Sequence, residues 1–341
     1  MTDRPILLGV DGGNTKTVAV VAGADGTILG AARVLRTSDI YAVPPDVAVA
    51  IHHEVSDAAL AAAGIRGDGG RASISAAFSL AGADWPEDIE LLESRLRPRW
   101  PDAVVVNDAI GALRAAVPEG PGVVVVCGTG AATGARGPDG KTWHTSFWQE
   151  PQGGTELGER ALRAVYRADL GIDPPTALTR RILAATGQPS VESLLHHSSA
   201  RDVLDRREPA GLAWVVLEAA DDGDAAAVAI VAQLGVDLGR TALAAARRVG
   251  IAEGVPFGLA LTGGVLRHPG GGLRDAIVAT VRAAAPRVVV LASAAEPVAG
   301  AVLLAFDAAG IASDVAVRER IRDGLAAADL YDTHPARVRA D

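Results

Sequence analysis

One stretch near the beginning of the chain restricts its possible folds more than any other. It reads Leu7-Leu8-Gly9-Val10-Asp11-Gly12-Gly13-Asn14-Thr15-Lys16-Thr17-Val18-Ala19-Val20-Val21. Two apolar runs joined by a short Gly/Asn turn predict a β-hairpin, because these residues accept the positive φ values that such turns need. A turn of this kind also exposes consecutive backbone N–H groups, which form a concavity for anions such as phosphate.

The two charged residues of this turn affect a bound anion in opposite ways. The Asp11 carboxylate repels phosphate, but a divalent cation between the two reverses the sign of that interaction. Lys16 supplies a positive charge to phosphate if its side chain points inward, and none if it points to solvent. An ordinary hairpin with a well-formed turn is the alternative explanation of the whole stretch.

The composition indicates a folded globular protein. The 341 residues, of which 49% are hydrophobic and 21% charged, suffice for two domains with a sizeable core. The net charge of −9 argues against nucleic acid or an anionic membrane as the main partner. We find no uncharged apolar run of about 18 residues and no basic-then-apolar signal pattern, so we expect a soluble, cytoplasmic protein.

The single cysteine, Cys127, excludes an internal disulfide and any cysteine-rich metal or cluster site. It follows four consecutive valines, so we expect a small buried hydrophobic residue and not a nucleophile. The histidine pairs 52–53 and 196–197 do not resemble metal sites, because adjacent residues point to different faces of a helix.

The order of predicted elements suggests two related halves. The first half predicts strands over 28–35 and 72–80 after the opening hairpin, helices over 46–63 and 86–96, and a short strand over 104–106. A Pro/Gly-rich break at 118–122 is the expected domain boundary. We therefore expect an N-terminal domain over 1–117, a C-terminal domain over 118–332 and a frayed tail over 333–341.

The second half begins as the first one does. Val123 to Cys127 predicts an apolar strand, Gly128-Thr129-Gly130 a tight turn, and Ala131 to Arg136 a returning strand. Two strand–glycine turn–strand units, one at the head of each half, suggest similar domains that face each other across a cleft. The rest of this half is mainly helical, with a long amphipathic helix over 224–249.

Three glycine turns follow predicted strands, and their combination is more specific than any one of them. They are Asp11-Gly12-Gly13-Asn14-Thr15, Gly128-Thr129-Gly130 and Thr262-Gly263-Gly264. None has the spacing of a Walker loop or of the dinucleotide-binding fingerprint. Their order and letters resemble the actin/hexokinase/heat-shock ATPase superfamily, and within it the N-acetylglucosamine kinase and BadF/BadG/BcrA/BcrD ATPase branch, up to about residue 309.

This resemblance implies an α/β fold with two actin-like (ribonuclease H-like) domains, a nucleotide cleft between them, and ATP and Mg²⁺ as ligands. It implies that Asp11 holds the metal through water, that two turns bind the phosphates, and that the third packs against adenosine. The residues concerned are Gly12, Gly13, Asn14, Thr15 and Lys16 in the first turn, Gly128, Thr129 and Gly130 in the second, and Gly263 and Gly264 in the third.

Asn107-Asp108 is the second key sequence. A carboxylate between a buried strand and a helix can project into an interdomain cleft and accept the proton of a hydroxyl that attacks phosphorus. Asn and Asp are also favoured N-cap residues, so Asp108 could simply cap the following helix. The resemblance favours catalysis, because the family's general base occupies this strand–Asp–Ala–helix setting, and it assigns Asn107 and Asp108 to acceptor binding.

The acceptor site departs from the family pattern, which has Gly-Trp-Gly followed by Gly-Asp-Glu-Gly. This chain keeps the aromatic residue as Trp148 but lacks the flanking glycines and the Asp. Glu150 or Glu156 could replace that Asp, although Glu156 could equally be a first-turn acid favoured by the helix dipole. Gly82 matches a position where the family's backbone approaches the acceptor, and Ser38 and Asp39 could close the pocket.

The sequence is therefore interpreted as a kinase that phosphorylates an amino-sugar hydroxyl with ATP, and we expect a homodimer. A cluster-dependent dehydratase activator is disfavoured by the single cysteine, and a type III pantothenate kinase by the chain length. A non-catalytic sugar- or nucleotide-sensing protein remains the alternative, because the stretch over 149–157 is altered.

Overall fold

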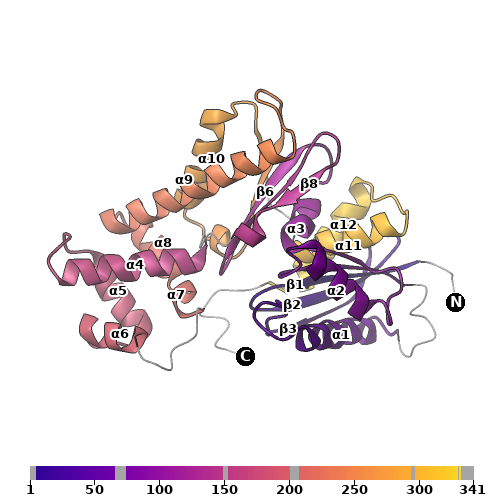
Figure 1. The fold of residues 1–341 in the computed structure, drawn as a ribbon, viewed down its shortest axis with the longest axis horizontal. Coiled ribbons are helices and arrows are strands. Elements are labelled where there is room, and N and C mark those ends of the chain that lie inside the picture. The colour runs from indigo at the N-terminus through magenta and orange to yellow at the C-terminus, as the bar shows by residue number, and fades with distance from the viewer. Residues whose placement is uncertain are drawn as a thin grey trace.

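The computed structural model describes residues 5–65, 74–148, 153–199, 207–292, 296–328 and 330–331. It contains two five-stranded sheets (Figure 1). The first sheet has the order β3-β2-β1-β4-β5 and consists of β1 (Ile6–Gly12), β2 (Thr17–Gly23), β3 (Ile28–Val34), β4 (Ile74–Leu80) and β5 (Val104–Asn107). The second has the order β10-β9-β6-β7-β8 and consists of β6 (Gly122–Cys127), β7 (Ala131–Arg136), β8 (Thr142–His144), β9 (Gly258–Thr262) and β10 (Val289–Leu291).

The two sheets have the same topology. In each, three consecutive strands form an antiparallel meander, and two later strands add in parallel beside the first. β1 thus corresponds to β6, and β4 to β9. This duplication confirms the expected two-domain α/β architecture, which rested on the repeated strand–glycine turn–strand units.

Helices cover both faces of the first sheet, because the apolar residues of its strands alternate between the two faces. Leu8 and Val10 pack with α1 (Pro45–Ala62) and α2 (Pro86–Leu96) on one face. Leu7 packs on the other face with α11 (Pro297–Ala308) and α12 (Val315–Ala328).

The position of α11 and α12 corrects the expected domain division. The sequence pattern predicted that residues 118–332 belong to the second half, but Val298, Phe306 and Ile321 lie in the core of the first sheet. The chain therefore returns to its first unit after it has completed the second. The apolar faces of these helices are complementary to the buried side of β1 and β2, which no local pattern reveals.

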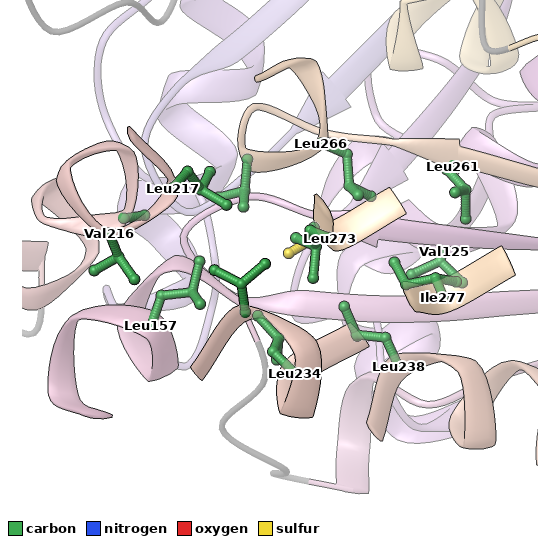
Figure 2. Close-up of a cluster of buried hydrophobic side chains, with 14 of the residues drawn as sticks. Val125, Leu157, Val216, Leu217, Leu234, Leu238, Leu261, Leu266, Leu273 and Ile277 are labelled. Carbon is green, nitrogen blue, oxygen red and sulfur yellow. The ribbon is translucent and has the colours of Figure 1, made fainter. Parts of the chain in front are cut away.

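The second sheet supports a larger helical layer. Its helices are α4 (Gly154–Asp169), α5 (Ala177–Thr186), α6 (Val191–Ser198), α7 (Arg207–Gly211), α8 (Ala213–Asp221), α9 (Ala225–Arg248) and α10 (Gly272–Ala284), with the 3₁₀ turns η2 (Ser146–Trp148) and η3 (Val265–Arg267). Figure 2 shows part of their common core, where Leu234 and Leu238 of α9 lie near Val125 of β6 and Ile277 of α10. Cys127 is fully buried in this core, and burial raises its pKa to about 12, as expected for a structural cysteine.

Among the described residues, α9 is the one helix whose length and composition would allow it to cross a membrane. Its apolar residues recur at helical spacing and face α10 and the second sheet. This packing is that of a core helix.

Helix α3 (Asp108–Ala116) lies between the two sheets and positions the site. One side contacts α11, where Gly300 meets the backbone of Gly111. The other side packs Ala112, Leu113 and Val117 against Val124 and Ala260 of the second sheet. The N-terminus of α3, with Asp108, is consequently held at the junction of the two units.

Candidate active site

Asp108 is the first residue of α3, and its neighbour Asn107 takes over the capping role. The Asn107 Oδ1 accepts a hydrogen bond of 3.0 Å from the backbone N–H of Ala109. The Asp108 side chain is therefore not the helix cap, which was the structural alternative for this residue.

The Asp108 carboxyl group is buried beside other acids. Burial raises its pKa to about 7, and the negative charges of Asp11, Asp84 and Asp39 add to this effect, while a hydrogen bond from the backbone N–H of Ala109 opposes it. A carboxyl group with a pKa near the pH of the cell is suited to accept and release a proton. Four carboxylates thus converge here, from β1, from the segment after β3, from the segment between β4 and α2, and from the start of α3.

Asp84 is a member of this group that was not predicted from the sequence. Its Oδ1 accepts a hydrogen bond of 2.8 Å from Asn107 Nδ2, and burial together with the charges of Asp39 and Asp88 raises its pKa to about 6. Asp84 comes two residues after Gly82, which has a φ of +82° and lies against the Asp39 carboxylate. An acid just beyond a glycine at a strand end was the available signal.

The 3₁₀ turn η2 brings the second unit to this site. Ser146 Oγ donates a hydrogen bond of 3.0 Å to Asn107 Oδ1, and the Phe147 ring lies 4.5 Å from that of Trp85 at the start of α2. Trp148, the expected acceptor contact, is 54% exposed, and the Arg248 guanidinium lies 5.9 Å from its ring. Of the three residues of η2, Ser146 and Phe147 therefore make the contacts with the first unit.

Of the two acids predicted for the acceptor site, the structure describes only Glu156. Glu156 pairs with Arg160 one turn further along α4, at 2.6 Å, and Arg160 also reaches Asp237 on α9. This ion-pair network agrees with the alternative explanation of Glu156, an acid in the first turn of a helix. Glu150 lies outside the described residues.

The first glycine turn presents free backbone donors beside a buried carboxylate. Asn14 and Thr15 are exposed at the tip between β1 and β2, and no hydrogen bond within the described part of the chain uses their N–H groups. The Gly13 N–H bonds to the Lys16 carbonyl at 3.0 Å and is not free. Gly12 is buried, and a Cβ there would lie 2.7 Å from Ser38 Oγ, so packing alone requires glycine.

Asp11 and Lys16 face the same inward region. Burial raises the pKa of Asp11 to about 6, while the hydrogen bond from Tyr331 and the charge of Lys16 oppose this rise. Burial and the neighbouring Arg267 lower the pKa of Lys16 to about 8. The Lys16 side chain therefore points inward, which was one of the two orientations considered.

The second and third turns lie against each other. The Gly128 and Thr129 carbonyls accept hydrogen bonds from the N–H groups of Gly154 and Thr155 at the start of α4. Gly263 has a φ of +106°, and a Cβ there would lie 2.3 Å from the Cys127 carbonyl oxygen. Only glycine fits both constraints. In the described residues, the N–H groups of Thr129 and Gly130 take part in no hydrogen bond.

Arg267 connects the third turn to the first. It follows Gly264 by three residues, forms an ion pair with Glu296, and is close enough to Lys16 to lower the pKa of its ammonium group. Together, the contacts link all three turns and Asp11 along the junction of the two units. Arg267 was not identified from the sequence, because a lone Arg after a turn carries no motif.

The profile of the BadF/BadG/BcrA/BcrD ATPase family matches residues 8–305. An N-acetyl-D-glucosamine kinase of Dictyostelium discoideum is 25% identical over 317 residues, covering 89% of this chain and 98% of that protein. An N-acetylmuramic acid/N-acetylglucosamine kinase of Clostridium acetobutylicum is 25% identical over 228 residues, which is 64% of this chain and 72% of that protein.

Solved structures of sugar kinases have a similar fold. A candidate N-acetylglucosamine kinase from Chromobacterium violaceum superimposes with a TM-score of 0.71 and 27% identity, over 89% of this chain and 100% of the other. A ROK family glucokinase from Streptomyces griseus, in complex with glucose and AMPPNP, shares the fold with a TM-score of 0.55 at 18% identity, over 89% of this chain and 99% of the other. Given the match over most of its length, this chain belongs to the BadF/BadG/BcrA/BcrD ATPase family.

Proposed function

We propose that this protein is a sugar kinase, which transfers the γ-phosphoryl group of ATP to a hydroxyl of an amino sugar such as N-acetylglucosamine. The observation that carries the proposal is the Asp108 carboxylate at the junction of the two units, freed from capping by Asn107 and with a pKa of about 7. The relatives that are N-acetylglucosamine kinases support the amino sugar as acceptor.

In the proposed reaction, Asp108 accepts the proton of the acceptor hydroxyl as its oxygen attacks the γ-phosphorus. The bond between that phosphorus and the bridging oxygen of ADP breaks, and ADP leaves with the electron pair. Phosphoryl transfer relies mostly on positioning and charge stabilisation, so the contribution of the protein is to align the reactants. The free N–H groups of Asn14, Thr15, Thr129 and Gly130 are the proposed phosphate donors.

Asp11 fits the requirements of a magnesium ligand. Mg²⁺ in such enzymes is bound by one or two carboxylates together with water and substrate phosphates. Within the described residues, Oδ2 of Asp11 accepts from Tyr331 and Oδ1 accepts no hydrogen bond, which leaves one oxygen for a metal-bound water. When bound, Mg²⁺ supplies charge neutralisation at the phosphates. Asp11 would hold it, and Lys16 would add a positive charge.

Asp39, Asp84 and Asn107 are the proposed acceptor ligands, together with Gly82. The Asp39 and Asp84 carboxylates would accept hydrogen bonds from sugar hydroxyls, as Asp108 does before it takes the proton. The Asn107 Oδ1 already accepts from Ala109 and Ser146, so this residue would contribute the Nδ2 hydrogen that Asp84 does not use. Trp148, Glu156 and Glu150 remain proposed contributors from the second unit. Because the stretch after Trp148 departs from the family pattern, the acceptor identity depends most on these residues.

The test is to incubate the purified protein with ATP and Mg²⁺ and to follow ADP release with individual sugars. N-acetylglucosamine, glucosamine, N-acetylmuramic acid derivatives and glucose form the panel. We expect release to be stimulated at least tenfold by an amino sugar and less by glucose. Nucleotide binding without stimulated turnover would contradict the proposal and favour a sensing protein.

A further inference from the structure

Tyr331 lies at the end of the described chain, beyond α12, yet its side chain is almost completely buried. Only 5% of its surface is exposed, and it packs in the core of the first sheet. Its hydroxyl bonds to Asp11, a residue 320 positions earlier in the sequence. The proposed function assigns no role to this residue.

Two hydrogen bonds fix the Tyr331 hydroxyl. Its oxygen accepts from the backbone N–H of Val298 at 3.1 Å, and its proton is donated to Asp11 Oδ2. Val298 lies in the first turn of α11, where the Glu296 side chain does not cap the helix. Since a hydroxyl has a single proton, the bond accepted from α11 leaves that proton directed at Asp11.

The rest of Tyr331 is held by cations from both units. Lys16 Nζ lies 4.5 Å from the ring centroid, and Arg267 Cζ lies 5.7 Å from it. Arg267 also donates a hydrogen bond of 3.0 Å to the Tyr331 carbonyl. The position of the ring therefore does not depend on the hydroxyl alone, and removal of the hydroxyl leaves it with these cation contacts.

We propose that Tyr331 is a positioning residue for Asp11: it holds Oδ2 so that Oδ1 faces the magnesium–nucleotide complex. This inference rests on the metal role given to Asp11 in the proposed function. A charge-assisted hydrogen bond restricts rotation of a carboxylate, and removal of such an outer partner typically costs about 10–100-fold in metal affinity or activity.

The experiment measures binding, so it does not require turnover. Calorimetry gives the affinity for a non-hydrolysable ATP analogue with and without Mg²⁺, for the unmodified protein, Tyr331→Phe and Tyr166→Phe. We expect Tyr331→Phe to reduce the gain in affinity due to Mg²⁺ at least tenfold, with metal-free affinity within about twofold. Tyr166→Phe, which removes a hydroxyl bonded to Ser198 away from the junction, should behave as the unmodified protein does.

A double variant separates positioning from a general structural effect. Asp11→Asn should reduce the gain from Mg²⁺ at least as much as Tyr331→Phe does, and the double variant should lose no more of this gain than Asp11→Asn alone. An unchanged or larger gain in Tyr331→Phe would overturn the proposal, as would a further loss in the double variant. Absence of any gain in the unmodified protein would overturn it too. Failure of the sugar-stimulated assay, by contrast, would count against the kinase function and leave this result standing.

Discussion

At the junction, Asp108 and its neighbour Asn107 have different roles. Asn107 uses its amide to cap α3, to accept from Ser146 and to donate to Asp84. Asn107 is thus the helix cap, and Asp108 is left for its proposed role as the base. Its raised pKa has burial as the main cause and the nearby carboxylates as the second.

Replacement of the proposed base tests this division directly. We expect Asp108→Asn to lower kcat by about 100-fold or more, which is the usual contribution of a general base. Affinity for the ATP analogue should change little, because Asp108 is not in the glycine turns. Asp173→Asn, which breaks an exposed ion pair with Arg167, is the control and should retain activity. Nearly full activity in Asp108→Asn would remove this residue from the mechanism.

The pH dependence follows from the same carboxylate. A base must be ionised to accept a proton, so kcat/KM should fall as pH decreases through about 7, the pKa of Asp108. Asp84→Asn removes a negative charge that raises this pKa, and its amide oxygen can still accept from Asn107. The acid limb should therefore move to lower pH by roughly half a unit or more. A limb that stays in place in this variant would mean that another group titrates.

At the scale of elements, close contact with α11 determines the position of α3. A Cβ at Gly300 would lie 1.8 Å from the Gly111 carbonyl oxygen, so these two helices approach to backbone distance. On its other side, α3 packs against the second sheet. A displacement of α3 would move Asp108 relative to both units.

Gly300→Ala should therefore destabilise the protein and impair catalysis together. Overpacking of this kind typically costs about 1–3 kcal/mol, and thermal unfolding should show a lower Tm with a reduced kcat. The matched control is Gly211→Ala on α7, where an added Cβ meets no atom within 4 Å. Alanine is the better helix former, so this control should be neutral or slightly more stable. Equal effects of both substitutions would argue against a packing cause.

The whole molecule joins its two units through contacts at the proposed reaction site. Ser146 reaches Asn107 on the acceptor side, and Arg267 reaches Tyr331 on the nucleotide side. If each ligand strengthens the contacts that the other also needs, the two ligands should bind cooperatively. Closure around both substrates would also exclude water from the transfer.

Thermal unfolding with ligands tests this coupling. A ligand at about 100 times its Kd stabilises the folded protein by roughly 2.7 kcal/mol. The Tm shift with each ligand alone is measured first, and the sum of the two shifts is the reference. We expect the amino sugar and the magnesium–ATP analogue together to raise Tm by more than the sum of the two. Ser146→Ala should bring the combined shift closer to the sum. If the Tm shifts of the two ligands are strictly additive in the unmodified protein, the two ligands do not bind cooperatively, which would contradict coupling between the two units.

Much of the fold, including the turns that line the candidate site, was predictable because its signals are local. The strand–glycine turn–strand units at 7–21 and 123–136 gave the duplicated topology, since turn chemistry depends on a few adjacent residues. Cys127 in its valine run was correctly predicted to be buried. The family resemblance, carried by three short turns and Asn107-Asp108, is confirmed by the family match.

What only the tertiary structure decided are the contacts between distant segments. The return of α11 and α12 to the first sheet brings Tyr331 to Asp11, and it contradicts the division made from the sequence. Asp84 and Arg267 join the site because sheet topology and helix packing bring their segments together. Local sequence fixes how a turn or a helix cap forms, because that energy comes from neighbouring residues. Pairings across the molecule depend on which apolar faces are buried against each other, and these exist only once the chain has folded.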